Sequence, residues 1–327
     1  MRPEVPTFVT PRDGIHTVDT QYMRPGLDAS HLIVEQGRVA FVDTGPNSAV
    51  PHLLAALERL GLAREQVDLV LLTHIHLDHA GGAGALMREL PNARAVIHPR
   101  GAKHLIDPRR LIEGSVAVYG AEEFAALYGE IVPIPAERVD IAADGTRVRL
   151  AGREFELIDT PGHALHHYCV VDRAANAIFS GDCFGISYRD LDTERGAFIY
   201  PTTTPVHFDP DAMHATLDRL MAYRPASIYL THFSRVTELE RLAADLHECV
   251  DGFVAIARRH AQQPDRAERI RTDMFDFLSR RLDDHGFAPD PRLRRELIGI
   301  DVELNSQGLE VWLERAHPNG ERHGTER

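Results

Sequence analysis

The sequence predicts an α/β fold followed by a helical extension, and two patterns support this prediction. From about residue 14 to residue 232, short apolar runs rich in β-branched residues alternate with segments of helical periodicity, and turn residues lie between them. After about residue 235, apolar residues recur only at three- and four-residue intervals, as they do on helix faces. One large core plus an extension accounts for a length of 327 residues. The expected divisions are an α/β domain at 1–235, the extension at 236–317 and a disordered tail at 318–327.

The apolar runs of the first part set the expected order of strands and helices. Five runs predict strands: His31–Val34, Val39–Val42, Asp68–Thr73, Phe155–Asp159 and Ser227–Thr231. Helical spacing predicts two helices between them, at Ala49–Leu60 and Ala83–Leu90. Turn residues indicate a hairpin around Val148 and Phe155. In the extension, three apolar stripes predict three helices, which carry Leu239–Ala257, Ile270–Leu282 and Leu293–Leu304.

Composition and charge argue against a nucleic-acid or membrane partner. The chain has 36 Lys and Arg against 49 Asp and Glu, a formal net charge of −13, whereas phosphate contact depends on clustered positive charge. No stretch approaches the length of a membrane span, and the amino terminus lacks the apolar core of a secretory signal. Three widely spaced cysteines suggest reduced thiols. We therefore expect a cytoplasmic protein with a small-molecule substrate, and a homodimer is one assembly open to it.

The strongest chemical signal is a cluster of three imidazoles and one carboxylate within six residues. It directly follows a predicted strand and contains His74, His76, Asp78 and His79. Buried polar groups without partners cost free energy, so such a cluster makes little sense as core. Imidazole and carboxylate are good ligands for zinc, iron and manganese, and a cluster this dense exceeds what one ion needs. The cluster therefore predicts a metal site.

Three further strand-like runs end in a side chain that can bind metal. The side chains are those of His163, Asp182 and His232. Each of them alone would more often be a surface histidine or a capping aspartate. Loops at the strand ends of α/β sheets converge on one point, however, and catalytic sites gather there. The four strand ends together therefore predict one shared site.

In this order the motifs resemble those of the metallo-β-lactamase superfamily, over about residues 14 to 235. The superfamily pattern is His-x-His-x-Asp-His, then Gly-His, Gly-Asp and a final His, and every part of it is present. The resemblance implies a four-layer αββα sandwich with a C-terminal helical extension. It also implies two divalent metal ions, zinc in the first place, with iron or manganese open. The implied ligands are His74, His76 and His163 for one ion, Asp78, His79 and His232 for the other, and Asp182 as a bridge between them.

The implied centre is suited to hydrolysis. Two metal ions that share a water lower its pKa towards neutrality and present it as hydroxide. One ion can also polarise the scissile carbonyl or phosphoryl oxygen, which stabilises the developing oxyanion. On the resemblance, Asp78 is the catalytic residue, because it orients the hydroxide as well as binding metal.

Four more residues are candidates for supporting the centre or contacting the substrate. Asp43 lies in a turn where members of the superfamily often place a carboxylate that orients a ligand, and Thr73 is a second candidate for this role. An Asx turn is the ordinary interpretation of Asp43. Tyr200 and His207 lie in a loop that can line the substrate pocket in this superfamily, so substrate contact is a candidate role for both.

Within the superfamily, the chain is most similar to the branch of glyoxalase II, lactonases and related hydrolases. Several members of that branch carry a C-terminal helical element over the site. Three other branches are disfavoured. The RNA-cleaving branch has a long inserted domain and the flavodiiron branch has Glu at the position of His76, and this chain has neither feature. The antibiotic-degrading branch is usually secreted, whereas no secretory signal is identified here. No set of basic residues arranged for glutathione is identified in the helical region. Small thioesters, lactones and phosphodiesters therefore all stay open as substrates.

Two other functions compete with that of a hydrolase. A persulfide dioxygenase would use a single iron, held by His74, His163 and Asp182, whereas the sequence also keeps the complete second ligand set. A regulatory protein would act through its helical extension, as the quinolone-signal response protein of this fold suggests. The complete ligand set favours hydrolysis over both. The sequence leaves the substrate, the native metal and the oligomeric state open.

Overall fold

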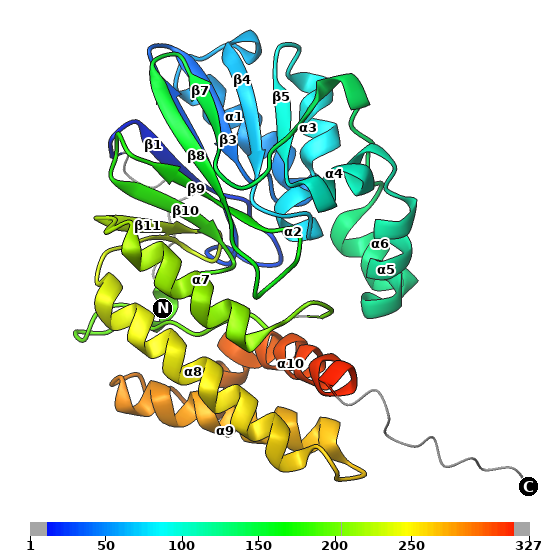
Figure 1. Ribbon diagram of the computed structural model, residues 1–327, viewed down its shortest axis with the longest axis vertical. Coiled ribbons are helices and arrows are strands. Elements are labelled where there is room, and N and C mark those ends of the chain that lie inside the picture. The colour runs from blue at the N-terminus through cyan, green and yellow to red at the C-terminus, as the bar shows by residue number, and fades with distance from the viewer. Residues whose placement is uncertain (1–11, 204, 317–327) are drawn as a thin grey trace, which may run out of the picture.

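The computed structural model describes residues 12–203 and 205–316, and in them two six-stranded sheets pack face to face (Figure 1). The strand orders are β1-β2-β3-β4-β5-β6 and β12-β11-β10-β9-β8-β7. Apolar side chains from both sheets, among them Val42, Phe155 and Phe179, form the core between them. Helices cover the outer face of each sheet, and three more follow at the C-terminal end. This arrangement confirms the predicted αββα sandwich with a C-terminal helical extension.

The first sheet combines antiparallel and parallel strands. Its strands are β1 (Ile15–Asp19), β2 (Ala29–Glu35), β3 (Arg38–Val42), β4 (Val67–Leu72), β5 (Arg94–Ile97) and β6 (Val139–Ile141). Strands β1 to β3 pair antiparallel, and β3 to β6 pair parallel. Parallel neighbours need crossover connections, which here contain the helices α1 (Val50–Arg59), α3 (Ala83–Glu89) and α4 (Pro99–Ile106). Leu53 of α1, Leu86 of α3 and Leu105 of α4 pack these helices against the sheet.

The second sheet directs three of its strand ends to the same edge. Its strands are β7 (Thr146–Leu150), β8 (Arg153–Asp159), β9 (Tyr168–Asp172), β10 (Ala177–Gly181), β11 (Ser227–Leu230) and β12 (Ser234–Val236). Strand β9 pairs antiparallel with both β8 and β10, and β10 pairs parallel with β11. Strands β8, β10 and β11 therefore run in the same direction. Helix α7 (Pro210–Ala222) and the start of α8 (Leu239–His260) cover the outer face.

The extension consists of three long helices that pack against one another below the sheets in Figure 1. They are α8 (Leu239–His260), α9 (Arg266–Asp284) and α10 (Pro291–Ala316), as the three apolar stripes predicted. Phe253, Leu278 and Leu309 lie in their common core. The boundary at residue 235 stays a prediction, and the predicted tail at 318–327 lies outside the described residues. No helix in the described part of the chain combines the length and the apolar character that a membrane span requires.

Several short helices complete the fold, and the sequence predicts none of them. Helix α2 (Leu77–Ala80) follows β4, and α5 (Arg109–Tyr119) and α6 (Ala121–Tyr128) follow α4. Short 3-10 helices lie at Asn47–Ala49, Arg64–Gln66, Ala136–Arg138 and Arg189–Leu191. Helix α5 has no fully buried residue, so the sequence lacks the strong apolar periodicity that a core helix shows.

Buried polar contacts tie α10 to the α/β part of the chain. The carboxylate of Asp301 accepts hydrogen bonds from the hydroxyls of Tyr200, at 2.9 Å, and Tyr188, at 3.2 Å. One turn further along α10, the backbone carbonyl of Asn305 accepts a hydrogen bond of 3.0 Å from the hydroxyl of Thr203, and the Asn305 amide donates to Pro201. The extension therefore fixes the loop that contains residues 200 to 203.

We expect Asp301→Asn to flatten the pH dependence of folding stability between about pH 4 and pH 6. Burial raises the pKa of Asp301 to about 6, although the hydrogen bond from Tyr200 opposes this shift. An unfolded Asp titrates near pH ~4, so the folded state holds an extra proton in this window and stability falls as pH rises through it. Urea unfolding across the window measures the slope. Equal slopes in the wild type and the variant would contradict the raised pKa.

Candidate metal centre

Seven side chains from four strand ends meet at one edge of the two sheets. They form three overlapping groups, and within each group the possible ligand atoms lie within 4.8 Å of one another. The groups are His74, His76 and His163; His74, His79 and Asp182; and Asp78, His79 and His232. His74, His76, Asp78 and His79 follow β4 or lie in α2. His163 follows β8, Asp182 follows β10 and His232 follows β11. The structure thus brings together every side chain that the sequence proposed as a metal ligand. Their role as ligands stays a prediction.

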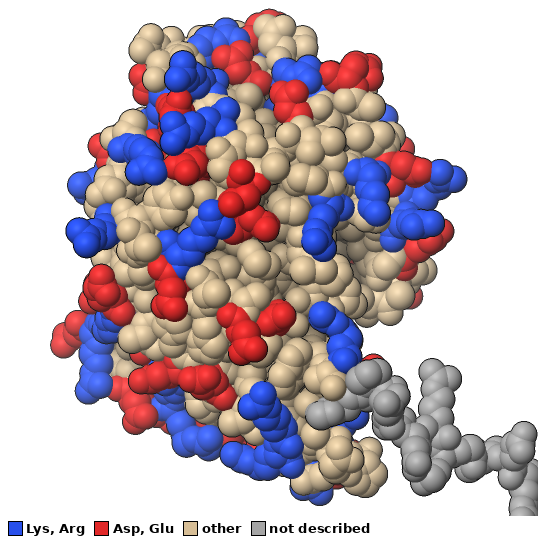
Figure 2. All heavy atoms as spheres, viewed as in Figure 1, with Lys and Arg blue, Asp and Glu red and all other residues tan. Residues whose placement is uncertain are grey.

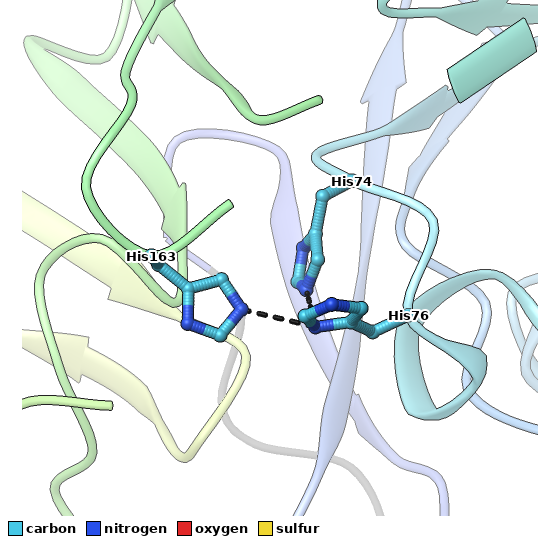
Figure 3. Close-up of side chains that lie close together, drawn as sticks. All are labelled: His74, His76 and His163. Atoms are coloured by element: carbon cyan, nitrogen blue, oxygen red, sulfur yellow. Dashed lines mark hydrogen bonds between the residues drawn. The ribbon is translucent and has the colours of Figure 1, made fainter. Parts of the chain in front are cut away.

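Three ring nitrogens converge in the first group. His74 Nε2 lies 2.9 Å from His76 Nδ1, and His163 Nε2 lies 3.0 Å from the same atom. Figure 3 shows the rings of His74 and His163 both directed at the ring of His76, His74 from the end of β4 and His163 from the loop after β8. A proton on His76 could satisfy only one of the two facing nitrogens, whereas a cation among the three would satisfy all of them.

The carboxylate of Asp182 faces two of these groups at once. Its Oδ2 lies 3.5 Å from His163 Nε2, and its Oδ1 lies 3.1 Å from His79 Nε2 and 3.5 Å from His232 Nε2. His79 and His232 also face Asp78, whose Oδ2 lies 3.6 Å from His79 Nε2 and 3.4 Å from His232 Nε2. Asp182 therefore lies between His163 on one side and His79 and His232 on the other, and its role as a bridge stays a prediction.

Hydrogen bonds on the outer side of four histidines set which ring nitrogen points inward. His79 Nδ1 lies 2.8 Å from the Asp43 carboxylate, and His232 Nδ1 lies 2.9 Å from the carbonyl of Leu27. Both partners only accept, so both Nδ1 atoms carry the proton and both Nε2 atoms keep a lone pair.

Two threonine hydroxyls fix the ring nitrogens of His74 and His163 in the same way. Thr73 Oγ1 donates to Asp43, and it therefore accepts from His74 Nδ1 at 3.2 Å. Thr202 Oγ1 donates to the carbonyl of Asp182, and it accepts from His163 Nδ1 at 2.7 Å. Four Nε2 lone pairs thus face the centre of the cluster. His79 Nε2 and Asp182 Oδ1 are buried without a hydrogen-bond partner, which fits a site for cations.

The charges of the cluster oppose one another across a few ångströms. Burial alone would lower the pKa of His79, but Asp182, Asp78 and Asp43 raise it well above its usual value. Asp182 likewise outweighs burial at His232 and raises its pKa to about 10. Burial alone would raise the pKa of Asp78, but His79 lowers it to about 2. The carboxylates therefore favour positive charge at this point of the cluster, and a metal ion would supply it while both Nε2 atoms keep their lone pairs.

Two glycines allow the chain to approach this centre closely. Gly162 and Gly181 have φ values of 131° and 49°, which favour glycine. A Cβ atom on Gly181 would lie 2.6 Å from both His167 Nε2 and Thr73 Oγ1, and one on Gly162 would lie 2.6 Å from the Cα of Met213. The glycines of the Gly-His and Gly-Asp motifs are therefore required by packing at the site.

The expectation for Tyr200 is corrected by the structure. Tyr200 is completely buried, and its hydroxyl donates to Asp301, so it supports the site from behind and does not face a substrate. His207, by contrast, lines the cleft over the centre, where its ring lies 5.9 Å from that of His166. Sequence reasoning missed Thr202 and the carbonyl of Leu27, for which no motif gives a signal.

A cleft with two lobes opens above the cluster, and both lobes reach Asp78 and Asp182. The arginine lobe, of about 360 Å³, is lined by His104, Arg110, His166 and His207 among others. The acidic lobe, of about 260 Å³, is lined by Glu123, Asp301 and Glu303 among others. Val118, Tyr119 and Leu304 line both lobes, so α5 and α10 face each other across the cleft. The helical extension thus forms one wall of the site.

Comparison with known proteins agrees with this geometry. A profile of the Metallo-beta-lactamase superfamily matches residues 24–232. Hydroxyacylglutathione hydrolase of Klebsiella pneumoniae is 30% identical over 161 residues, which cover 46% of this chain and 47% of that protein. The chain spans about half the length of the curated relatives it matches.

Solved structures share the fold over almost the whole chain. A metallo-beta-lactamase family protein of Thermus thermophilus superposes with a TM-score of 0.67 at 20% identity, and covers 93% of this chain and 94% of its own. An archaeal superfamily protein of Sulfolobus tokodaii superposes with a TM-score of 0.63 at 18% identity, and covers 92% and 99%. The fold therefore has solved counterparts for nearly its full length.

We expect Thr202→Val to weaken binding of one of the two ions by about 10- to 100-fold, because His163 loses the acceptor that holds its tautomer. Zinc titration against a competing chelator measures both affinities. Thr193→Val is the matched control, since the Thr193 hydroxyl donates to the carbonyl of His285 at the end of α9, away from the cluster. Equal zinc affinities in the Thr202 variant and the wild type would contradict this role of Thr202.

Proposed function

The chain belongs to the metallo-beta-lactamase superfamily, and we propose that it is a metal-dependent hydrolase of a small ester-like substrate. The observation that carries the proposal is the placement of Asp182, whose two oxygens face separate groups of histidines. A partial match to hydroxyacylglutathione hydrolases supports cleavage of an ester-like bond. Thioesters, lactones and phosphodiesters are the substrate classes to be tested.

We propose that the cluster holds two divalent ions, zinc in the first place. His74, His76 and His163 would bind one of them, and Asp78, His79 and His232 the other, with Asp182 facing both. Nitrogen and carboxylate oxygen are ligands that zinc prefers. Ions held in this way supply Lewis acidity and a water with a pKa near neutrality.

The protein's own groups complete the chemistry. The Asp78 carboxylate reaches the base of the cleft, where both lobes meet, and its side chain keeps 24% of its surface exposed. It can therefore orient an attacking water and accept a hydrogen bond from it. Asp43 keeps His79 in place from the opposite side, at 2.8 Å. Helices α5 and α10 wall the cleft and limit access of bulk water to the reacting bond.

The geometry also bears on the two competing functions. A single iron at His74, His163 and Asp182 would leave Asp78, His79 and His232 without a use, although their ligand atoms also lie within 4.8 Å of one another. A purely regulatory protein would need neither group. We therefore prefer the hydrolase, with a small-molecule substrate in the cytoplasm and no nucleic-acid partner, in keeping with the net charge of −13.

We expect Asp78→Ala to reduce turnover of an ester-like substrate by about 100-fold or more, because both a water-orienting group and a ligand are lost. A panel of thioesters, lactones and phosphodiesters is assayed with the zinc-loaded protein. Asp140→Ala is the control, since this carboxylate pairs with Arg94 on an exposed part of β5 and β6. Activity that survives both chelation of metal and loss of Asp78 would overturn the proposal.

A further inference from the structure

We propose that the substrate of this centre carries an apolar group and, apart from the reacting bond, one negative charge that lies beside Arg110 in the arginine lobe. The inference rests on the proposed function, because it names the substrate class for the same centre. It assigns Arg110 to the selection of charge and the apolar side chains of the cleft to the selection of the hydrocarbon part. Both assignments come from the lining of the two lobes.

Exposed apolar side chains gather at the cleft. Within the described residues, the large apolar side chains with the highest exposure are Met23, Val118, Ile141, Leu165, Val206 and Ile300. Four of these six line one or both lobes, with exposures of 48% for Met23, 41% for Val118, 50% for Val206 and 39% for Ile300. Exposed apolar surface costs free energy, and a contiguous patch of it commonly marks a ligand site.

Helix α5 also exposes apolar side chains to the cleft. None of its residues is fully buried, yet Leu111, Val118 and Tyr119 point to the cleft. Across the cleft, Leu304 of α10 lines both lobes. The apolar face of α5 therefore borders open space, and a hydrocarbon group in the cleft would complete its packing.

The arginine lobe has a cation without a counter-charge. Arg110 lines this lobe and has no ion pair among the residues that the structure describes, whereas its neighbour Arg109 pairs with Asp107. Residues 99–119 contain four Lys and Arg against two Asp and Glu, although the whole chain has a net charge of −13. Figure 2 shows several Lys and Arg side chains over the region of α4 and α5, with Asp and Glu side chains beside them. The local charge therefore favours an anion at this end of the cleft.

Nearby groups support the same polarity. Burial lowers the pKa of His207, and Arg315 and Arg100 lower it further, so both guanidinium groups act on this end of the lobe. Burial also lowers the pKa of His104. Both shifts favour the neutral imidazole, and Arg110 is the cationic side chain that lines the lobe, with Arg100 and Arg315 near its end at His207.

The acidic lobe gives the cleft a direction. Glu123, Asp301 and Glu303 line it and would repel an anion, whereas Leu127 and Ile186 offer apolar surface. A substrate with one negative charge therefore binds across the centre in one orientation, with the charge in the arginine lobe. The charge could belong to the acyl part or to the leaving group, and these sources are separated by experiment.

Three thioesters test the charge. They are the hexanoyl thioester of N-acetylcysteamine, which is neutral, the hexanoyl thioester of 3-mercaptopropionate, with the charge on the leaving group, and the adipoyl thioester of N-acetylcysteamine, with the charge on the acyl part. We expect one charged compound to exceed the neutral one in kcat/KM by about 10-fold, and Arg110→Glu to abolish that advantage through KM. Arg109→Glu, a paired and exposed neighbour, leaves it intact.

A series of acyl chains tests the apolar part. In wild type, kcat/KM should rise from acetyl to octanoyl by up to about 4-fold for each methylene that becomes buried. Val118→Ser should flatten this rise, and Ile141→Ser should not, because Ile141 is 62% exposed and lies outside the cleft. No dependence on chain length in wild type would overturn this part.

The outcomes separate the inference from the proposed function. Hydrolysis that depends on neither charge nor chain length overturns the inference and leaves the hydrolase intact. If none of the thioesters is cleaved, binding of the corresponding amides is measured by calorimetry. Binding of a charged amide that Arg110→Glu abolishes would support the assigned lobe although the hydrolase fails, and binding that is indifferent to Arg110 would overturn the lobe as well.

Discussion

The carboxylate of Asp43 connects the two sheets directly beneath the candidate metal centre. It accepts hydrogen bonds from the backbone and the hydroxyl of Thr73, at the end of β4, and from the hydroxyl of Thr231, at the end of β11. It also accepts a hydrogen bond of 2.8 Å from His79 Nδ1. Asp43 is completely buried, and a buried carboxylate is tolerated only when its oxygens are satisfied in this way. Strand ends from both sheets are therefore held in one place, and the seven side chains that follow them meet.

The helical extension takes part in the same network. Asp301 and Asn305 of α10 hold the loop that carries Tyr200 and Thr203 through hydrogen bonds. Thr202, in the same loop, accepts a hydrogen bond from His163 Nδ1. The extension thus contributes a wall of the cleft and, through this loop, the orientation of one candidate ligand. Helix α10 is accordingly part of the site, and α8 and α9 pack against it. The same helix lines a cleft whose two ends differ in charge, which gives a bound substrate a direction.

Much of this could be predicted from the sequence, because strand ends and their motifs are local. His74 to His79 follow an apolar run directly, and the glycines before His163 and Asp182 mark turns in the same way. Thr202 could not be predicted, since its partner lies 39 residues away and the two residues after it are also threonines. Tyr200 was assigned to the substrate because its loop is near the site, but a carboxylate 101 residues later draws its hydroxyl inward. Such contacts between distant segments are set by packing and leave no local pattern.

We propose that Asp182 stands between two ions. Elemental analysis by mass spectrometry, on protein purified without added metal or chelator, tests it most directly. Two divalent ions per chain are predicted, because two groups of ligand atoms flank the carboxylate. One ion per chain, or none even after incubation with zinc, iron and manganese, would contradict the account.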